Sequence, residues 1–157
     1  MKPKIAALLA KYESGSGELI EVIDGLTDGD LSKRLEPKKW SIREQVHHLA
    51  DAELNMVQRM KKVISEESPL LPAYDQDKWA DNLSYDKGSV EASIAVFYSL
   101  RGSMALALRK LHDKDFDRVG IHTEDGKVTL LELLEHSIEH SDHHIGMIRK
   151  IIKKHKL

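Results

Sequence analysis

The chain has 157 residues, a length that fits one domain with its own core, and we expect a single domain over residues 1–157. It contains no cysteine, which excludes disulfides, a protein thiol nucleophile and thiolate ligands, so any metal must be held by nitrogen or oxygen atoms. With 24 basic and 26 acidic residues the formal charge is -2, so we expect no nucleic-acid partner.

Apolar residues recur at helical spacing in four long segments, and no segment alternates as a half-buried strand does, so the fold class is predicted to be all-α. The first segment runs from Pro3 to Leu26, and Gly15 and Gly17 are expected to weaken or kink it. Its apolar run is short and interrupted by charged residues, unlike a signal or membrane segment. We therefore expect a soluble cytoplasmic protein with no membrane partner.

The second segment has a well-marked start at "SIRE". Ser41 precedes Glu44 by three residues, the capping-box spacing in which each side chain binds a free backbone N–H of the first helical turn. The helix is predicted to continue to about Glu66 with one apolar stripe. His47 and His48 lie inside it.

A connection of about twenty residues follows, "SPLLPAYDQDKWADNLSYDKG", and it contains two prolines. This length is typical of a functional or crossing loop rather than a plain turn, and we expect Trp79 to pack against the helices. The third helix is predicted from Ser89 to about His112.

The last part of the chain combines a turn with a helix. "EDG" indicates a tight turn, such as a small hairpin uses. Thr129 and Glu132 form a second capping box, and the helix is predicted to continue to about Lys154. Four helices of roughly 22 to 26 residues would each be about 33 to 39 Å long, the proportions of a four-helix bundle. The long loop would then join helices two and three.

The last helix collects four of the nine histidines: His136, His140, His143 and His144. His140 and His144 are four residues apart, so their side chains can converge on one point. His136 would lie about 12 Å along the axis from His144, too far for both to bind one ion at roughly 2.0 to 2.1 Å. This helix therefore offers two metal ligands, and a third must come from elsewhere.

The second helix offers the third ligand. His48 lies on a flank of the apolar stripe, whereas His47 projects about 100° away, so we prefer His48 and keep His47 as the alternative. An isolated pair at this spacing is most often two solvated side chains, and the second histidine cluster on another helix is what raises the expectation of a metal site. His136 and His143 are expected to be solvated or to contact ligands rather than bind the ion.

Four stretches carry a resemblance to a known family: "WSIREQVHHLADAE", "LPAYDQDKWA", "LRKLHDKDFDRVGIHTEDGKVTLLELLEHS" and "EHSDHHIGMI". In this order and over nearly the whole chain they resemble the DinB/YfiT-like group of metal-dependent four-helix-bundle proteins. The resemblance implies that one histidine of helix two and the H-x-x-x-H pair of the last helix hold a divalent metal, which corresponds to His48, His140 and His144.

The resemblance also implies two chemistries: metal-assisted hydrolysis of a small ester or amide, and transfer of a low-molecular-weight thiol such as bacillithiol to an electrophilic small molecule. A site of three histidines with an open fourth position suits catalytic zinc, and nickel or iron also accepts imidazole. Because the chain has no cysteine, the sulfur must come from a cosubstrate, so we favour thiol transfer. Hydrolysis and a non-catalytic metal-binding dimer are the alternatives.

No catalytic base can be assigned from the sequence. Asp51 and Glu139 lie near the expected ligands and could orient imidazoles, although carboxylates on exposed helix faces are more often solvated. Tyr74, Asp75 and Trp79 could wall the pocket, although simple packing of the long loop is the preferred interpretation. We expect a homodimer formed through helix faces.

Overall fold

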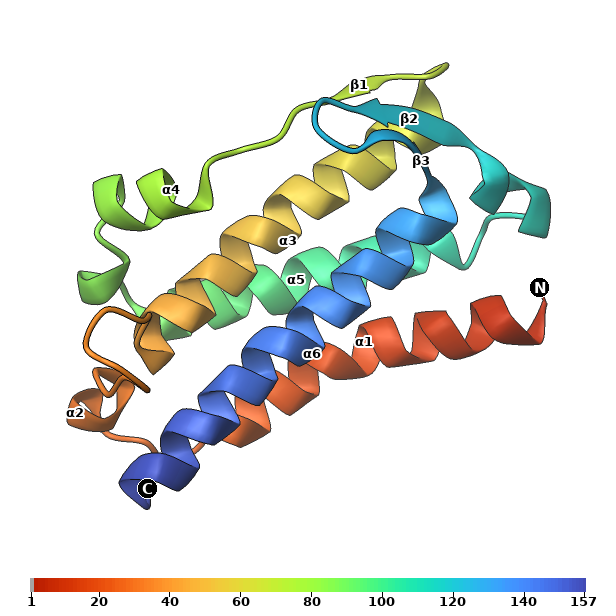
Figure 1. The fold of residues 1–157 in the computed structure, drawn as a ribbon. Coiled ribbons are helices and arrows are strands. Elements are labelled where there is room, and N and C mark those ends of the chain that lie inside the picture. Colours follow the sequence, from red (N-terminus) through yellow and green to blue (C-terminus); the bar gives the residue numbers. More distant parts are fainter. Residues whose placement is uncertain (1) are drawn as a thin grey trace.

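The structure is a computed structural model that describes residues 2–157. Four long helices make up most of it (Figure 1). They are α1 (Pro3–Ile23), α3 (Ile42–Ser65), α5 (Val90–Leu108) and α6 (Leu130–His155). The predicted all-α four-helix bundle is confirmed. Within residues 2–157, none of the helices combines the length and apolar character that crossing a bilayer requires.

The helix starts follow the predicted capping residues. The Ser41 side chain accepts a hydrogen bond from the Glu44 backbone N–H, and Thr129 does the same for Glu132, so both capping boxes are present. The ends differ by a few residues from the predictions. α1 stops three residues before the expected Leu26, and the predicted weakening at its two internal glycines does not interrupt the helix.

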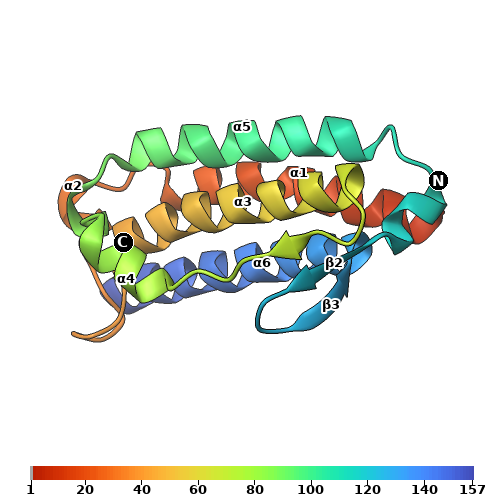
Figure 2. The same ribbon diagram turned by 90° about the horizontal axis from the view of Figure 1, so that it is seen from above.

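The four helices do not alternate in direction along the chain. α1 and α6 run one way, and α3 and α5 both run the other way (Figures 1 and 2). This is possible because residues 66–89 cross back along the bundle between the end of α3 and the start of α5. Both α3 and α1 contact α5 and α6. The predicted long connection is therefore a crossover, and it lies along the α3 and α6 side of the bundle (Figure 2).

Short elements occupy the connections, and most of them were not predicted. They are α2 (Asp28–Leu31), β1 (Leu70–Leu71), α4 (Gln76–Asn82), β2 (Val119–His122), β3 (Gly126–Thr129) and two 3₁₀ turns at Tyr85–Lys87 and Asp113–Asp117. β2 and β3 form the small hairpin that "EDG" indicated, with Gly126 at φ +77° in its turn. β1 from the crossover pairs in parallel with β2, which ties the crossover to the hairpin.

The interior consists of two apolar clusters. One contains Leu9, Met60, Met104 and Leu134, and the other contains Leu19, Leu49, Phe97 and Ile145. On each helix, buried polar or small residues separate the two stretches: Gly15 and Ser16 on α1, Glu53 on α3, Arg101 on α5, and Ser137 and Ser141 on α6. A polar layer therefore crosses the middle of the bundle.

Arg101 is the centre of this polar layer and is only 1% exposed. Its Nε donates to Glu53 at 3.0 Å, Nη1 donates to the Tyr12 carbonyl at 3.0 Å, and Nη2 donates to the Ser137 carbonyl at 2.9 Å. The guanidinium also lies 4.6 Å from the ring centroids of Tyr12 and Phe97. The Tyr12 hydroxyl and the Ser137 hydroxyl donate to Glu53, so each of the two buried charges has several hydrogen-bond partners inside the bundle.

Gly15→Ala is expected to destabilise the protein, although alanine is the better helix former. A Cβ at this position would lie 2.3 Å from Nη1 of Arg101, whose hydrogen bonds leave it no room to move. We expect a loss of ~1–3 kcal/mol in the free energy of unfolding, measured by urea denaturation. Gly17→Ala in the same helix meets nothing within 4 Å and should stabilise by ~0.5–1 kcal/mol. Equal effects of the two substitutions would contradict this packing.

Candidate metal centre

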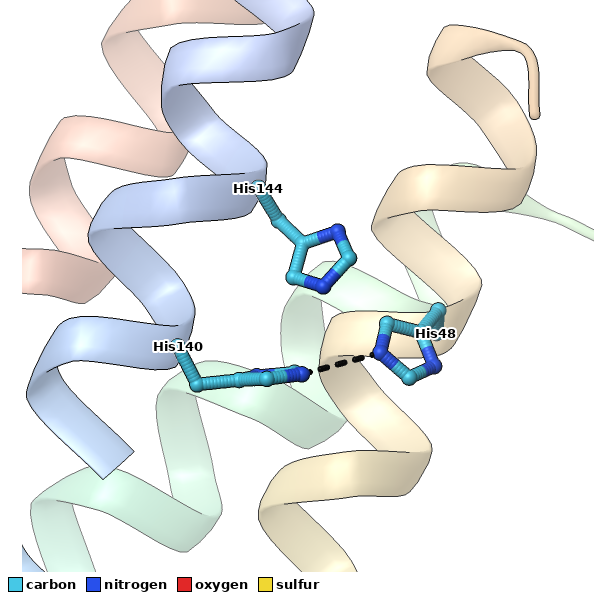
Figure 3. Close-up of side chains that lie close together, drawn as sticks. All are labelled: His48, His140 and His144. Atoms are coloured by element: carbon cyan, nitrogen blue, oxygen red, sulfur yellow. Dashed lines mark hydrogen bonds between the residues drawn. The ribbon is translucent and has the colours of Figure 1, made fainter. Parts of the chain in front are cut away.

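Three histidines from two helices converge at one point beside the polar layer. His48 projects from α3, and His140 and His144 project from α6 (Figure 3). One ring nitrogen of each lies within 4.8 Å of the others, close enough for small ring rotations to bring all three onto one ion. The Nε2 atoms of His48 and His140 are 3.0 Å apart. The structure thus brings together the three residues that the sequence singled out.

The three imidazoles are held neutral near pH 7. Burial lowers the pKa of His48 to about 4. Burial, followed by the neighbouring imidazoles, lowers the pKa of His140 to about 3 and that of His144 to about 2. A neutral imidazole keeps one nitrogen lone pair free, which is the form that binds a metal ion.

Gln45 fixes the tautomer of His144. Its side-chain Oε1 lies 2.5 Å from Nδ1 of His144, and because this oxygen only accepts, Nδ1 must carry the proton. The lone pair of His144 is then on Nε2, the nitrogen that faces the other two rings (Figure 3). Gln45 is 4% exposed and lies three residues before His48 on α3. The sequence reasoning did not assign it this role.

The donor set fits a divalent cation. The two facing Nε2 atoms of His48 and His140 cannot both carry a proton at 3.0 Å, so at least one lone pair is directed at the point where the rings meet. Nδ1 of His48 is buried without a hydrogen-bond partner among residues 2–157, so hydrogen bonds alone do not satisfy this ring. Zinc and nickel both accept neutral imidazole nitrogen, so either ion suits these ligands.

Trp40 covers the histidines from the start of α3. Its ring centroid lies 4.7 Å from that of His48 and 6.3 Å from that of His144, and the planes of the Trp40 and His144 rings differ by 27°. The capping box at Ser41 fixes the chain directly after this tryptophan. Trp40 therefore shields one side of the centre from water, a role that its position outside the helical pattern did not indicate.

His47, the alternative to His48, points elsewhere. Its Nδ1 lies 2.5 Å from the Ser93 hydroxyl on α5, and its ring packs against Tyr85. A Cβ on Gly88 would lie 2.5 Å from the His47 ring, so the chain needs a glycine there to pass close to it. His47 holds the end of the crossover against α3 and α5. Geometry therefore places His48, and not His47, beside the α6 pair.

The other predicted residues lie around the centre in different ways. Asp51 accepts a hydrogen bond from the Tyr85 hydroxyl and, within residues 2–157, forms no hydrogen bond with the three imidazoles. Glu139 is exposed and has no ion-pair partner among the described residues. His136 stacks on His140 with ring centroids 6.1 Å apart, and His143 meets the edge of His144 at 5.1 Å.

The residues expected from the long loop separate into two groups. Tyr74 lines the cleft beside His140, and Trp79 packs against the Tyr74 ring at 4.7 Å. Asp75 is exposed and caps α4 by accepting from the Lys78 backbone N–H at 3.0 Å. Tyr74 is thus the member of this group that reaches the site.

A cleft opens from the histidines along the groove between α3 and α6. A cavity of about 290 Å³ reaches His140 and is lined by Leu49, Met56, Phe97 and the crossover residue Tyr74. Glu53 is the carboxylate in its wall, and that carboxylate is bonded to three partners. The cavity is large enough for a small molecule beside the three imidazoles.

Gln45→Ala is expected to weaken metal binding without removing a ligand. Loss of the hydrogen bond to His144 leaves its tautomer and ring orientation unfixed, which typically costs ~10–100-fold in metal affinity. Competition with a coloured zinc chelator measures the change. Gln58→Ala, an exposed position of the same helix, is the matched control and should bind as wild type. Wild-type affinity in Gln45→Ala would contradict the role of Gln45.

The metal-free protein is expected to lose stability as the pH falls from about 6.5 to about 4. An unfolded histidine takes up a proton near its ordinary pKa of 6.5, whereas the folded pKa is about 4 for His48 and about 3 for His140. The unfolded state binds more protons throughout this window, so the free energy of unfolding decreases with decreasing pH. Urea denaturation at several pH values measures the slope. His140→Phe should reduce it, and an unchanged slope would contradict this assignment.

Comparison with known proteins identifies the family. The family model described as the DinB superfamily matches residues 11–148. The chain belongs to the DinB superfamily. A relative from Oceanobacillus iheyensis, named as a candidate metal-dependent hydrolase, is 32% identical over 141 residues, which cover 90% of this chain and 81% of the relative. Bacillus subtilis YfiT, also named as a candidate metal-dependent hydrolase, is 29% identical over 143 residues, which cover 90% of this chain and 80% of YfiT.

Solved structures agree with this assignment. The B. subtilis YfiT structure, described as a probable metal-dependent hydrolase with an unusual four-helix bundle topology, matches with a TM-score of 0.93 at 27% identity. The match covers 99% of this DinB chain and 90% of YfiT. A mycothiol-dependent maleylpyruvate isomerase matches with a TM-score of 0.73 at 12% identity, covering 92% of this chain and 60% of the isomerase, a likeness of fold alone.

Proposed function

We propose that this DinB protein binds one divalent metal ion through His48, His140 and His144 and acts on a small molecule in the adjoining cleft. The observation that carries this proposal is the convergence of three neutral imidazoles beside a cavity. Zinc is the expected ion, and nickel would accept the same ligands. When bound, such an ion supplies positive charge and an open coordination position, which lower the pKa of a bound thiol or water.

The surrounding residues prepare this site for an incoming small molecule. Gln45 holds His144 in the tautomer that leaves Nε2 free, and Trp40 covers the rings on one side. Leu49 and Phe97 give the cavity an apolar wall, so a substrate there would be partly shielded from water. The chain thus supplies orientation and a partly dry environment, which strengthen electrostatic effects on the substrate.

We favour a low-molecular-weight thiol, such as bacillithiol, as the nucleophile. The cavity that reaches His140 offers no free carboxylate to accept a proton, because Glu53 is bonded to Arg101, Tyr12 and Ser137. A thiol, with an ordinary pKa of about 8.5, needs less help to ionise than water does. The sulfur would bond to a carbon of the electrophile, the leaving group would depart with the bonding electrons, and the thiol proton would pass to solvent.

Hydrolysis of a small ester or amide is the second candidate. It is favoured by the names of the relatives from O. iheyensis and B. subtilis. A hydrolase needs a group that accepts a proton from water. Glu139, exposed in the wall of the wider part of the cleft, is the carboxylate that could serve.

A paired assay separates the two candidates. Zinc-loaded and nickel-loaded protein is supplied with bacillithiol, cysteine or coenzyme A together with monochlorobimane, and separately with p-nitrophenyl acetate. We expect thiol-dependent conjugation that is lost in His140→Ala and kept in His155→Ala, a histidine that bonds the Arg34 carbonyl at the far end of α6. Ester hydrolysis with no conjugation for any thiol would contradict thiol transfer and select the hydrolase.

A further inference from the structure

The cleft continues from the histidines toward the β2–β3 hairpin. The cavity of about 290 Å³ at His140 and a second cavity of about 510 Å³ share Met56, Arg59, Tyr74 and His136 as lining residues. The second cavity extends to the hairpin, where His122 lines it. The two cavities therefore adjoin, and Arg59 and Tyr74 lie where they meet.

Arg59 enters this cleft with most of its hydrogen-bonding capacity unused. Its Nη2 donates to the Pro72 carbonyl at 2.7 Å, and its other N–H groups bond to nothing in residues 2–157. No carboxylate of that part of the chain lies within ion-pair distance of it. By contrast, Arg101 pairs with Glu53 and Arg43 pairs with Asp28. Glu124 and Asp125 act on the charge of Arg59 through space without forming an ion pair with it. The guanidinium therefore keeps free N–H groups, which suit a ligand anion.

Tyr74 offers a second unused donor at the same place. Its side chain is half-buried, and its hydroxyl forms no hydrogen bond within residues 2–157. Burial, together with the nearby charge of Asp51, raises the pKa of Tyr74 to about 12, so the hydroxyl keeps its proton near neutral pH. A guanidinium and a phenol O–H in one cleft are both donors, and both suit an oxygen anion.

The hairpin end of the cleft limits which anions can enter. Five carboxylates line the wider cavity: Glu124, Asp125, Glu132, Glu135 and Glu139. Asp125 pairs with His122, and Glu135 pairs with Lys4, whereas Glu124 and Glu139 have no ion pair among the described residues. This acidic rim disfavours anionic groups at the hairpin end, so an anionic group is better placed at Arg59, on the side of the narrower cavity, whose one carboxylate, Glu53, is paired with Arg101.

We propose that Arg59 and the Tyr74 hydroxyl form an anion subsite that binds a carboxylate or phosphate group of the small-molecule substrate or cosubstrate. The rest of the bound molecule extends along the cleft toward His140. The subsite deepens the proposed function, since the assignment of its ligand as a substrate rests on that function. The subsite would favour reactants that carry an anionic group. Because Tyr74 belongs to the crossover, the crossover would then help to recognise the substrate.

Nuclear magnetic resonance titration of the zinc-loaded full chain with succinate and with methyl phosphate tests this subsite. We expect saturable shifts at the Arg59 Nε–H and the Tyr74 amide, and the probe that binds identifies the anionic group. Arg59→Ala should raise the Kd at least about ten-fold, the change that corresponds to ~1.4 kcal/mol. Arg149→Ala removes the same charge from an exposed site and should leave the Kd unchanged.

A second variant separates binding from loop anchoring, because Arg59 also holds Pro72. Arg59→Lys keeps the charge and one donor group, so its Kd should lie between those of wild type and Arg59→Ala. An equal Kd in wild type, Arg59→Lys and Arg59→Ala would overturn the subsite. Zinc content, measured on the same samples, separates the two proposals. Absence of zinc would contradict the proposed function, whereas the anion subsite is decided by whether the Kd for the anion depends on Arg59.

Discussion

Replacing His140 by alanine is expected to lower the affinity for zinc more than ~100-fold. The loss should exceed the ~10–100-fold typical when a group that merely orients a ligand is removed, because a ligand itself disappears. His140 is central to the cluster: its Nε2 lies 3.0 Å from that of His48, and its ring centroid is 4.4 Å from that of His144. The two remaining imidazoles would hold an ion weakly. Chelator competition with purified variants measures the affinity.

His143→Ala is the matched control for this experiment. It removes an imidazole from the same helical turn, but His143 is exposed and meets His144 only at the ring edge. We expect near wild-type zinc affinity. Zinc binding that declines equally in both variants would mean that the histidine-rich stretch of α6 binds metal diffusely, and the defined centre would be wrong.

Replacing Arg101 by methionine is expected to lower the free energy of unfolding by ~3–5 kcal/mol. Methionine fills much of the volume but leaves the Glu53 carboxylate buried without its cation. It also leaves the carbonyls of Tyr12 and Ser137 without their donor. Urea denaturation followed by circular dichroism measures the change.

Two further variants show whether the buried pair causes this effect. Arg109→Met removes an arginine that pairs with Glu13 on the surface of the same helix bundle, and solvent should compensate for most of that loss. Arg101→Met combined with Glu53→Met removes both buried charges and should recover part of the stability. If Arg101→Met were no more harmful than Arg109→Met, the polar layer would not hold the bundle together.

The bundle and its helix starts could be predicted because they depend on local sequence. The spacing of apolar residues and the pairs Ser41–Glu44 and Thr129–Glu132 act within one or two helical turns. The length of the connection was compatible with a crossing loop or with a functional loop, and the common direction of α3 and α5 was decided only by the observed path of residues 66–89. β1, with two residues, exists only because it pairs with β2 about fifty residues later in the chain.

The proximity of the three histidines in the candidate site was predictable to a similar degree. The four-residue spacing of His140 and His144, and the flank position of His48, are helical periodicities that the sequence displays. Gln45 and Trp40 were not predicted as part of the site. Their roles depend on contacts with His144 of α6, which no spacing within one helix reveals. Arg59 was not predicted for the same reason. That it bonds the Pro72 carbonyl of the crossover and forms no ion pair can be seen only in the folded structure.

The central claim is that two helices share one metal ion, and elemental mass spectrometry of protein purified without a histidine tag tests it most directly. The proposal predicts close to one zinc or nickel ion per chain in wild type and in His47→Ala, and a sharp decrease in His48→Ala. The neighbouring His47 is the control because it bonds Ser93 and points away from α6. A wild-type protein that holds no metal after incubation with zinc and nickel, or equal metal content in both variants, would contradict the claim.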